Sequence, residues 1–475
     1  MDLGLIREIA LNGRGVEVRM VLTYPGCPLA GHLVEQVRRK VRSVTGDEPV
    51  EVVLVDEVWS WNDAAPRLVW GGRNMKRVYM DHNATTPLRE EVLEAMLPYL
   101  REEFGNASSP HSFGIRARRA VESAREKVAT ALGTRPREII FTGCGTESDN
   151  QAIKGVAFAN RNRGDHIVTS RIEHKAVLQT CQYLEKQGFQ VTYLLVDKYG
   201  VVNPDDVARA ITDQTVLVSV MFANNEVGTI QPIAEIAQVC RERGVYFHTD
   251  AVQAVGKLPV DVGQLGVDLL SLSAHKFYGP KGVGALYVRK GVRIDPLLHG
   301  GHQEEGRRAA TENVAGIVGL SKAIELRLEE MEAEAERLTA LRERLYDGLA
   351  ARIDHVYLNG HPTERLPGTL NLCFEYVEGE GIIMGLDLVG VAVSSGSACT
   401  SATLSPSHVL LAMGVHPAVA QGSIRFSLGR ENTEADVETV LETLPPIVER
   451  LRAMSMFSEQ SPFPEEAGPR HRMTR

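Results

Sequence analysis

The feature that most constrains this chain is a strand–helix alternation that repeats from Val78 onward. Short, almost uninterrupted apolar runs predict strands, and amphipathic stretches such as residues 115–132 lie between some of them. Strands that are apolar on both sides are typical of parallel sheets covered by helices on both faces. The sequence therefore predicts an α/β domain with a mostly parallel sheet. Its strands are expected at residues 139–142, 166–170, 191–196, 215–223, 245–251, 268–273 and 284–289.

Further units are expected on either side of this alternation. Residues 1–75 hold two strand-like segments around a helical one and end in a linker marked by Pro66 and Gly71-Gly72. After a long charged helix at about 323–353, strands are followed by a helix that begins near Thr433 at a capping-box pattern. This order favours a second, smaller α+β domain. The tail from 458 is rich in Pro, Glu and Arg and predicts disorder.

Composition excludes several classes of protein. Lys and Arg total 52 against 61 Asp and Glu, and the net charge of -9 without a basic block argues against direct nucleic-acid binding. The longest uncharged run, residues 388–407, is too rich in Gly, Ser and Thr to span a membrane. The opening residues lack the pattern of a signal peptide. The 6 cysteines form no CxxC pair, which disfavours zinc knuckles and disulfide frameworks and predicts a reducing, cytoplasmic setting.

Three segments at predicted strand ends carry candidate chemistry. Lys276 follows a buried strand, where a Schiff base with an aldehyde cofactor would remove its charge; the alternative is a lysine that reaches solvent. Asp250 ends another strand, where it suits a pyridine nitrogen or, alternatively, a helix N-cap. The glycine-rich turn at 142–150 opens a helix and suits a phosphate, although many such turns are rich in glycine. Together the three predict a site for pyridoxal phosphate (PLP).

A single thiol, Cys399, lies in a run of small polar residues at 394–403. Such a run has little to pack and predicts a mobile arm. A thiol on such an arm suits a nucleophile or a sulfur carrier, and the alternative is a chance surface cysteine.

A series of segments occurs in the order typical of one known family: YMDHNATTP (79–87), FGNASSPHSFG (104–114), FTGCGTESDNQAIKG (141–155), EHKAV (173–177), NNEVGTIQPI (224–233), HTDAVQAVGK (248–257), SAHKFYGPKGVGALYVR (273–289), GRRAATENVAGIVG (306–319), SSGSACTS (394–401) and SIRFSLGR (423–430). Through them, residues 77–455 resemble the NifS/IscS-type cysteine desulfurases, class V aminotransferases of PLP fold type I. The resemblance implies a large domain with a mostly parallel, seven-stranded-type sheet and a smaller α+β C-terminal domain, preceded here by a small α+β domain. The expected boundaries are 1–75, 76–457 (large part about 91–325, small part about 326–457 plus 76–90) and a disordered tail at 458–475.

The resemblance also implies roles for single residues. Lys276 would form the Schiff base with PLP and shuttle the substrate's Cα proton, and His174 would stack on the ring and act in acid–base steps. Cys399 would attack the sulfur of the bound cysteine, keep it as a persulfide and leave alanine. The remaining implied contacts are Asp250 to the ring nitrogen, Gln253 to the ring oxygen, Gly145, Thr146, Ser273 and His275 to the phosphate, Thr311 to the phosphate of a dimer partner, Asn225 to cofactor and substrate, and Arg425 to the substrate carboxylate.

The chain departs from the family's pattern at three positions. Cys144 lies in the phosphate turn near a helix N-terminus, where thiols become more acidic. We interpret it as a tolerated small residue, the alternative being a redox-sensitive thiol. Ala310 precedes Thr311 where glycine is usual, and His302 replaces a glycine. These two changes are expected to stiffen their loop.

The first 75 residues resemble the last two-thirds of the SufT/PaaD-like domain, which is linked to iron–sulfur cluster maturation. The resemblance rests on TYPGCPLA (23–30) and on Trp59 to Trp61. It makes Cys27 a candidate metal ligand, and Cys399 a candidate cluster contact during sulfur transfer. The alternative is an unrelated small α+β addition.

The sequence thus predicts a cytoplasmic, homodimeric, PLP-dependent cysteine desulfurase that supplies sulfur for iron–sulfur cluster assembly or tRNA thiolation. Its expected partners are L-cysteine and a cluster scaffold or other sulfur-acceptor protein, with no membrane contact. Two alternatives stay open. One is a selenocysteine lyase or another PLP-dependent lyase on the same fold, and the other is a non-catalytic scaffold for assembly partners.

Overall fold

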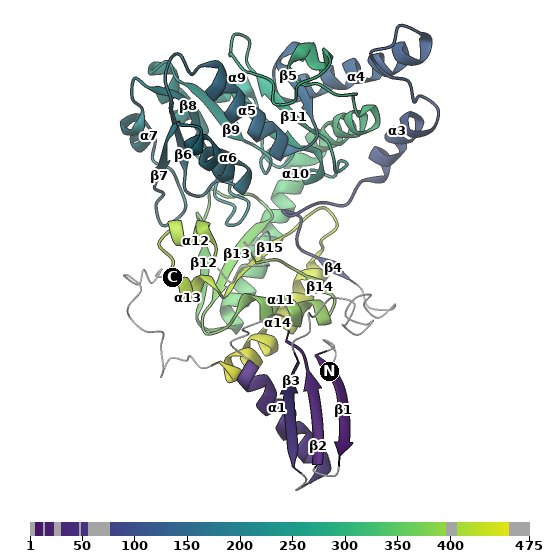
Figure 1. The fold of residues 1–475 in the computed structure, drawn as a ribbon, viewed down its shortest axis with the longest axis vertical. Helices are drawn as coiled ribbons and strands as arrows, with labels where there is room; N and C mark the ends of the chain where they lie inside the picture. Colours follow the sequence, from purple (N-terminus) through teal and green to yellow (C-terminus); the bar gives the residue numbers. More distant parts are fainter. Residues whose placement is uncertain are drawn as a thin grey trace. The chain divides into compact units, whose positions relative to one another are not determined.

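The computed structural model describes residues 5–12, 15–22, 30–46, 49–55, 77–395 and 406–455 (Figure 1). It divides into two compact units, one of residues up to 77 together with 387–391 and one of the remaining residues from 78 on. Cys27, Cys399 and the predicted tail at 458–475 lie outside the described residues. The domain boundaries drawn from the sequence stay predictions.

The N-terminal unit is a small α+β structure. Strands β1 (Ile6–Asn12) and β2 (Gly15–Met20) are antiparallel, and β2 runs parallel to β3 (Val50–Leu54), after helix α1 (Ala30–Thr45). Val16, Val18 and Val50 form its buried core, against which Val37 and Val41 of α1 pack. The predicted strand, helix and strand are confirmed. The additional edge strand β1 was missed because its apolar residues do not form a buried face: Leu11 is 79% exposed.

The main unit is built on a seven-stranded sheet of order β5-β11-β10-β9-β8-β6-β7. The neighbours from β10 to β7 are parallel, whereas β11 is antiparallel to both β10 and β5. This confirms the mostly parallel sheet and all seven predicted strands. Their bounds are β5 (Ile139–Thr142), β6 (His166–Ser170), β7 (Gln190–Leu194), β8 (Thr215–Ser219), β9 (Tyr246–Asp250), β10 (Leu269–Ser273) and β11 (Gly284–Val288).

Helices cover both faces of this sheet, as Figure 1 shows. On one face α5 (Gly145–Ala159) and α6 (Lys175–Lys186) pack on strand residues such as Ile140 and Ile167. On the other face α4 (Ser112–Ala131), α8 (Ile233–Glu242) and α10 (Val314–Arg352) pack on the adjacent strand residues, such as Phe141 and Val168. Successive strand residues point to opposite faces, so each strand needs apolar side chains at nearly every position. Smaller helices of this part are α3 (Glu90–Arg101), α7 (Pro204–Ala210) and α9 (Val262–Leu265).

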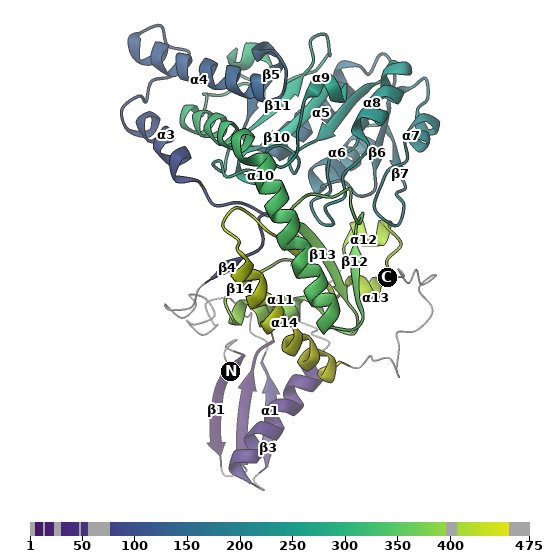
Figure 2. The ribbon, with the colours of Figure 1, turned by 180° about the vertical axis from the view of Figure 1, so that it is seen from behind.

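A smaller antiparallel sheet, β12 (Val356–Asn359), β13 (Thr369–Phe374) and β15 (Ser423–Ser427), follows in sequence. Figure 2 shows the long helix α10 (Val314–Arg352) running from the large sheet to this smaller part, beside α14 (Glu434–Met454). Thr433 and Asp436 form the capping box expected before α14. The other elements here are α11 (Gly379–Leu388), α12 (His408–Ala412), α13 (Pro417–Ala420) and the short strands β4 (Val78–Tyr79) and β14 (Val391–Ala392).

The segment after β4 brings a second chain stretch to the edge of the large sheet. The N–H of His82 donates to the carbonyl of Ser427 in β15, and the N–H of Thr86 donates to the carbonyl of His275. Residues 81–86 are thereby held between the smaller sheet and the turn that follows β10. As for membranes, no helix within the described ranges combines the length and the apolar character needed to cross a bilayer.

Candidate active site

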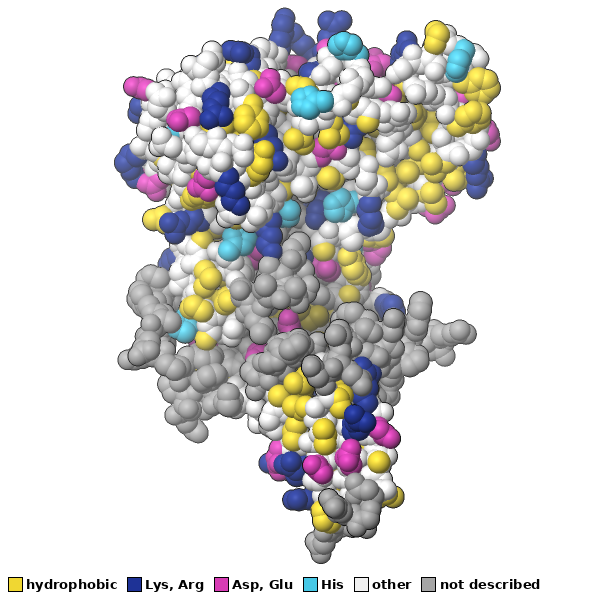
Figure 3. Space-filling model, viewed as in Figure 1, with side chains coloured by type: hydrophobic (Ala, Val, Ile, Leu, Met, Phe, Trp, Pro, Cys, Tyr) yellow, Lys and Arg dark blue, Asp and Glu magenta, His cyan; other side chains and the backbone are white. Residues whose placement is uncertain are grey.

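A cavity of about 1040 Å³ lies at the carboxyl ends of the parallel strands. Open α/β sheets bind their ligands at this edge, because the loops that follow the strands converge there. On the face of the main unit seen in Figure 3, His, Lys and Arg side chains gather below α5 and α6. The cavity brings together the predicted residues Gly145, Thr146, His174, Asn225, Asp250, Gln253, Ser273, His275, Lys276 and Arg425.

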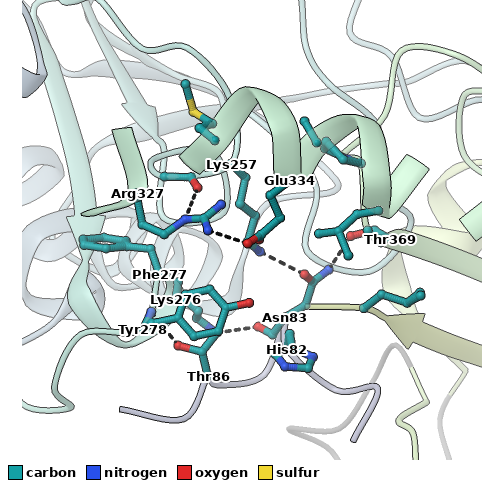
Figure 4. A pocket seen from close by; sticks show the side chains of 17 residues that line it. His82, Asn83, Thr86, Lys257, Lys276, Phe277, Tyr278, Arg327, Glu334 and Thr369 are labelled. Carbon is teal, nitrogen blue, oxygen red and sulfur yellow. Dashed lines mark hydrogen bonds and ion pairs between the residues drawn. The ribbon is translucent and has the colours of Figure 1, made fainter. Parts of the chain in front are cut away.

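Lys276 ends a short 3-10 helix, Ala274–Lys276, directly after β10. Its ammonium is half-buried and donates to the carbonyls of Asn83 (2.7 Å) and Ala84 (2.8 Å), the first of which Figure 4 shows. The positive charge of Lys276 lowers the pKa of Lys257 and of His275, so other basic groups lie close to this amine. This arrangement suits an amine that must lose its proton and react.

Asp250 and His174 face the same cavity from β9 and from the start of α6. The carboxylate of Asp250 accepts from the N–H of Val252 at 2.9 Å, and its pKa is raised by burial, against the lowering effect of His174 and Lys276. Nδ1 of His174 accepts from the N–H of Ala176 at 3.1 Å, and burial lowers the pKa of the ring. An Nδ1 acceptor leaves the neutral ring's proton on Nε2. The site therefore pairs a buried acid that needs a cation with a neutral imidazole.

The start of α5 forms a cup suited to a phosphate. The helix is 15 residues long and begins at Gly145, where an added Cβ would lie 2.7 Å from Val252 Cγ2 and 3.4 Å from Ser273 Cβ. Within the described part of the chain, the buried hydroxyl of Ser273 has no hydrogen-bond partner. A phosphate at the helix N-terminus would supply that partner. These residues fit the PLP that the sequence predicts, with Asp250 placed to balance a pyridinium charge.

Arg425 lies in β15 and is 3% exposed. It donates from Nη1 to the carbonyl of Asn225 at 2.9 Å and from Nη2 to Asp81 Oδ1 at 2.7 Å. Its Nε is a buried donor without a partner among the described residues. Beside it, burial raises the pKa of the Glu226 carboxyl to about 7. A carboxylate ligand would complete the hydrogen bonds of Arg425.

The described residues that flank 396–405 are both tied to this cavity. Ser394 and Arg425 exchange main-chain hydrogen bonds of 3.2 and 2.7 Å. On the other side, the hydroxyl of Ser407 donates to the Glu226 carboxylate. Cys399 itself lies outside the described residues, as does Cys27. Both assignments therefore stay predictions.

Two other residues singled out by the sequence are described. Thr311 is exposed and is not among the cavity's described lining, and Ala310 before it has a positive φ of 100°. Cys144 is the N-cap of α5 and its sulfur accepts from the N–H of Glu147 at 3.4 Å. Within the described ranges, no three His, Cys, Asp or Glu side chains cluster as a metal site.

Sequence reasoning assigned no role to several residues that build this site. Asn83, Lys257 and Glu226 each make hydrogen bonds to predicted site residues or to the flank of the Cys399 segment. All three lie inside segments that carry the resemblance. Each of them is a polar side chain inside a segment that holds predicted site residues. That position alone assigns no role, and the hydrogen bonds of the folded chain are needed to identify one.

Comparison with known proteins matches two families to the chain. The family described as "Aminotransferase class-V" matches residues 78–440, and the one described as "Iron-sulfur cluster assembly protein" matches residues 1–53. A relative from Methanosarcina thermophila, named cysteine desulfurase IscS, is 60% identical over 380 residues, which is 80% of this chain and 94% of the relative. One of the same name from Dictyoglomus turgidum is 58% identical over 387 residues, covering 81% of this chain and 98% of the relative.

Solved structures give the same result. A protein described as NifS-like superposes with a TM-score of 0.75 at 44% identity, covering 79% of this chain and all 100% of that chain. The structure of SspA in complex with cysteine superposes with a TM-score of 0.67 at 39% identity, covering 74% of this chain and 99% of that one.

Proposed function

Since the chain belongs to the class V aminotransferase family and, within it, to the cysteine desulfurases, we propose how its own residues carry out the reaction. The chain is an enzyme of a family that implies PLP, and the match over residues 1–53 links its activity to iron–sulfur cluster assembly. The proposed reaction takes L-cysteine and the thiol of Cys399 to L-alanine and a Cys399 persulfide. One C–S bond breaks, one S–S bond forms, and the sulfur is oxidised while Cβ is reduced, so no further oxidant is needed.

PLP, when bound, supplies an electron sink that weakens the bonds at Cα and Cβ of the amino acid. Asp250 would pair with the ring nitrogen of PLP, and the start of α5 with Ser273 and His275 would hold its phosphate. Arg425 and Asn225 bind the carboxylate of L-cysteine and orient its sulfur toward Cys399. The amine of Lys276 takes the Cα proton and returns a proton to the product, while His174 moves a proton at the substrate's sulfur.

The thiol nucleophile must be delivered and then withdrawn, because the persulfide has to reach an acceptor. The anchors at Ser394 and Ser407 support this assignment, since they hold both flanks of the Cys399 segment beside the substrate groups. The chemistry also explains the residue type, because a thiolate attacks sulfur readily and a hydroxyl does not.

We further propose a homodimer in which Thr311 completes the phosphate site of the partner subunit. Two observations support it. Thr311 is exposed, and apolar side chains lie exposed over α3 and the start of α4, toward the right of Figure 3: Leu100 (59%), Phe104 (72%), Phe113 (42%) and Ile115 (39%). Apolar surface of this kind marks protein interfaces.

The proposed acceptor of the persulfide sulfur is a scaffold protein for iron–sulfur clusters, and the proposed setting is the cytoplasm, where thiols stay reduced. The N-terminal unit is proposed as a maturation module in which Cys27 contacts the metal cargo. Sulfur transfer to a tRNA-thiolating enzyme and turnover of selenocysteine are the competing outcomes that acceptor and substrate assays separate.

The observation that carries this proposal is the convergence of Lys276, Asp250, His174 and Arg425 on one cavity. Its test measures alanine release and persulfide from L-cysteine. Lys276→Ala should lose the cofactor's visible absorption and the activity, whereas Cys399→Ser should keep the absorption and form no persulfide.

A matched control is Cys144→Ser, because Cys144 is a second thiol at the same cavity. This variant should form persulfide at a rate near that of the unchanged protein. If Cys399→Ser forms persulfide in native yield, another thiol accepts the sulfur, and Cys144 is the first to examine. That result would refute the proposed role of Cys399.

A further inference from the structure

A second, smaller cavity of about 30 Å³ is also lined by Lys276 (Figure 4). It has room for two or three water molecules, because a water needs roughly 10–15 Å³ of such space. Lys276 lines both this cavity and the large one, whereas Lys257 lines only the small one among the described residues. The small cavity is therefore lined by two lysines, Lys276 and Lys257.

Lys257 binds two side chains of the site. Its ammonium donates to Gln253 Oε1 at 2.7 Å and to Asn83 Oδ1 at 3.0 Å. Gln253 in turn donates from Nε2 to the carbonyl of Asn83 at 2.9 Å. The three residues thus form a closed ring of hydrogen bonds through the side chain and the main-chain carbonyl of Asn83, and Lys257 supplies two of the three donations.

The carbonyl of Asn83 is shared between this ring and the reactive lysine. It accepts from Lys276 Nζ at 2.7 Å as well as from Gln253. The side-chain amide nitrogen of Asn83 also donates to Thr369 Oγ1 at 2.9 Å. This bond fixes the orientation of the amide, so that its oxygen, Oδ1, faces Lys257. Any movement of Asn83 would move the partner of the Lys276 amine.

The surroundings of Lys257 disfavour the charged form of its amine. Burial lowers the pKa of its ammonium, and so do the positive charges of Lys276, Arg425 and Arg327, while Glu334 raises it. Glu334 is itself engaged by Arg327 at 2.7 Å, as Figure 4 shows. A buried cation opposed by three others is kept only where its hydrogen bonds are needed.

We propose that Lys257 is a positioning residue: by holding Gln253 and Asn83 together it fixes the carbonyl that meets the amine of Lys276. The inference rests on the proposed function in one respect, namely that Lys276 is the group that reacts. Lys257 itself touches neither substrate nor cofactor. Its effect passes through Asn83 to the amine and through Gln253 to the cofactor ring.

The test replaces Lys257 in the full-length, cofactor-loaded protein. Lys257→Met removes the donors and keeps the length, and Lys257→Arg keeps donors and charge. The control is Lys154→Met, because Lys154 of α5 is a partly buried lysine that lines neither cavity, and its Nζ lies 4.5 Å from the centre of the Tyr183 ring. For each variant we measure kcat and KM for L-cysteine, the position of the cofactor's absorption band and cofactor retention during dialysis without cysteine.

We expect Lys257→Met to lower kcat about tenfold or more, with KM changed less than about threefold, since the lost contacts lie behind the reactive amine and not at the substrate. Its absorption band should shift, and cofactor should be lost faster. Lys257→Arg should recover kcat to within about threefold of the original, and Lys154→Met should leave all readouts unchanged.

The route through Asn83 is tested by combining Lys257→Met with Asn83→Ala. If Lys257 acts through this residue, the double variant should lose no more than the worse single variant. Additive losses would overturn the inference, as would an Arg variant that is as impaired as the Met variant or a Met variant within twofold of the original kcat. Cofactor retention is measured without cysteine, so it decides the role of Lys257 even if cysteine proved not to be the substrate.

Discussion

At the scale of single residues, the site is marked by carboxyl groups whose pKa is raised by burial. The pKa of Glu173 rises to about 8 and that of Glu226 to about 7, while those of Asp250 and Asp149 are raised in the same direction. Such groups cost stability when they ionise, and the fold tolerates them only where a cation or a reaction requires them. For Asp250 that cation is the proposed pyridinium of PLP.

The raised pKa of Glu226 predicts a pH-dependent contribution to stability. Because its folded pKa of about 7 lies above the usual 4.5, its stabilising contribution is complete below about pH 4.5 and is lost as the pH rises through 7. Glu226→Gln should therefore gain stability relative to the original as the pH rises from 5 to 8, by about 1–3 kcal/mol. Chemical unfolding at both pH values measures this, and a difference that stays constant or falls with pH would contradict it.

Sequence reasoning singled out residues whose type conflicts with their position, and their roles stay predictions. It is unusual to find a charged side chain at the end of an apolar strand, or a run of glycines at the start of a helix. Three residues in such positions, Lys276, Asp250 and Gly145, line one cavity. Lys257 and Asn83 were missed because neither conflicts with its local sequence. Their significance comes from contacts across about 170 residues of chain, since Lys257 and Asn83 are 174 positions apart.

At the scale of elements, strands were easier to predict than helix limits. A strand buried on both faces shows as an apolar run, and each of the seven runs became a strand of the large sheet. Helix α10 was expected from about 323, yet it begins at Val314, because Asn313 caps it by accepting from the N–H of Gly316 at 3.1 Å. The predicted start was based on the charged residues of the helix, so its apolar first turns were not included.

The loop before α10 carries a testable strain. Ala310 has a φ of 100° and is exposed, in a region of backbone conformation that L-residues adopt at a cost of roughly 1–2 kcal/mol. Ala310→Gly should raise the free energy of unfolding by about 0.5–1 kcal/mol, because the relief exceeds the added chain entropy of glycine. The same substitution at exposed Ala435, within the first turn of α14, should lower stability. Equal losses at both positions in thermal unfolding would refute the strain.

At the scale of the whole molecule, the chain joins a complete enzyme fold to a small unit of its own. The class V family matches residues 78–440 and the iron–sulfur assembly family matches 1–53, and no residue of the first 77 lines the large cavity in the described part of the chain. The sequence favours a boundary between residues 75 and 76 because the family segments start at Tyr79, and this boundary stays a prediction. It could not identify the acceptor protein that the N-terminal unit serves, because the acceptor is a separate chain.

Removal of residues 1–75 is expected to leave alanine release from L-cysteine within about twofold of the original, because the lining of the cavity comes from residue 83 onward. Delivery of sulfur to a cluster scaffold should fall. Alanine release and cluster reconstitution are measured side by side, with Cys27→Ala as a second variant. If truncation abolished alanine release, the unit would be a structural part of the enzyme; if both variants matched the original in both assays, it would be a passive addition.

The two anchors of residues 396–405 have a consequence for how the thiol meets its target. Because Ser394 is tied to Arg425 and Ser407 to Glu226, both anchors lie at the site, and the number of residues between them limits how far Cys399 can lie from it. The probability that a chain segment brings a group to a fixed point falls roughly as the three-halves power of its length, so we expect a ten-residue Gly-Ser insertion between the two anchors to slow persulfide formation only about threefold. The segment between Ser394 and Ser407 can therefore lengthen, so that Cys399 reaches a more distant acceptor, with little loss of rate. The distance over which sulfur is delivered can thus evolve separately from the chemistry at the cavity.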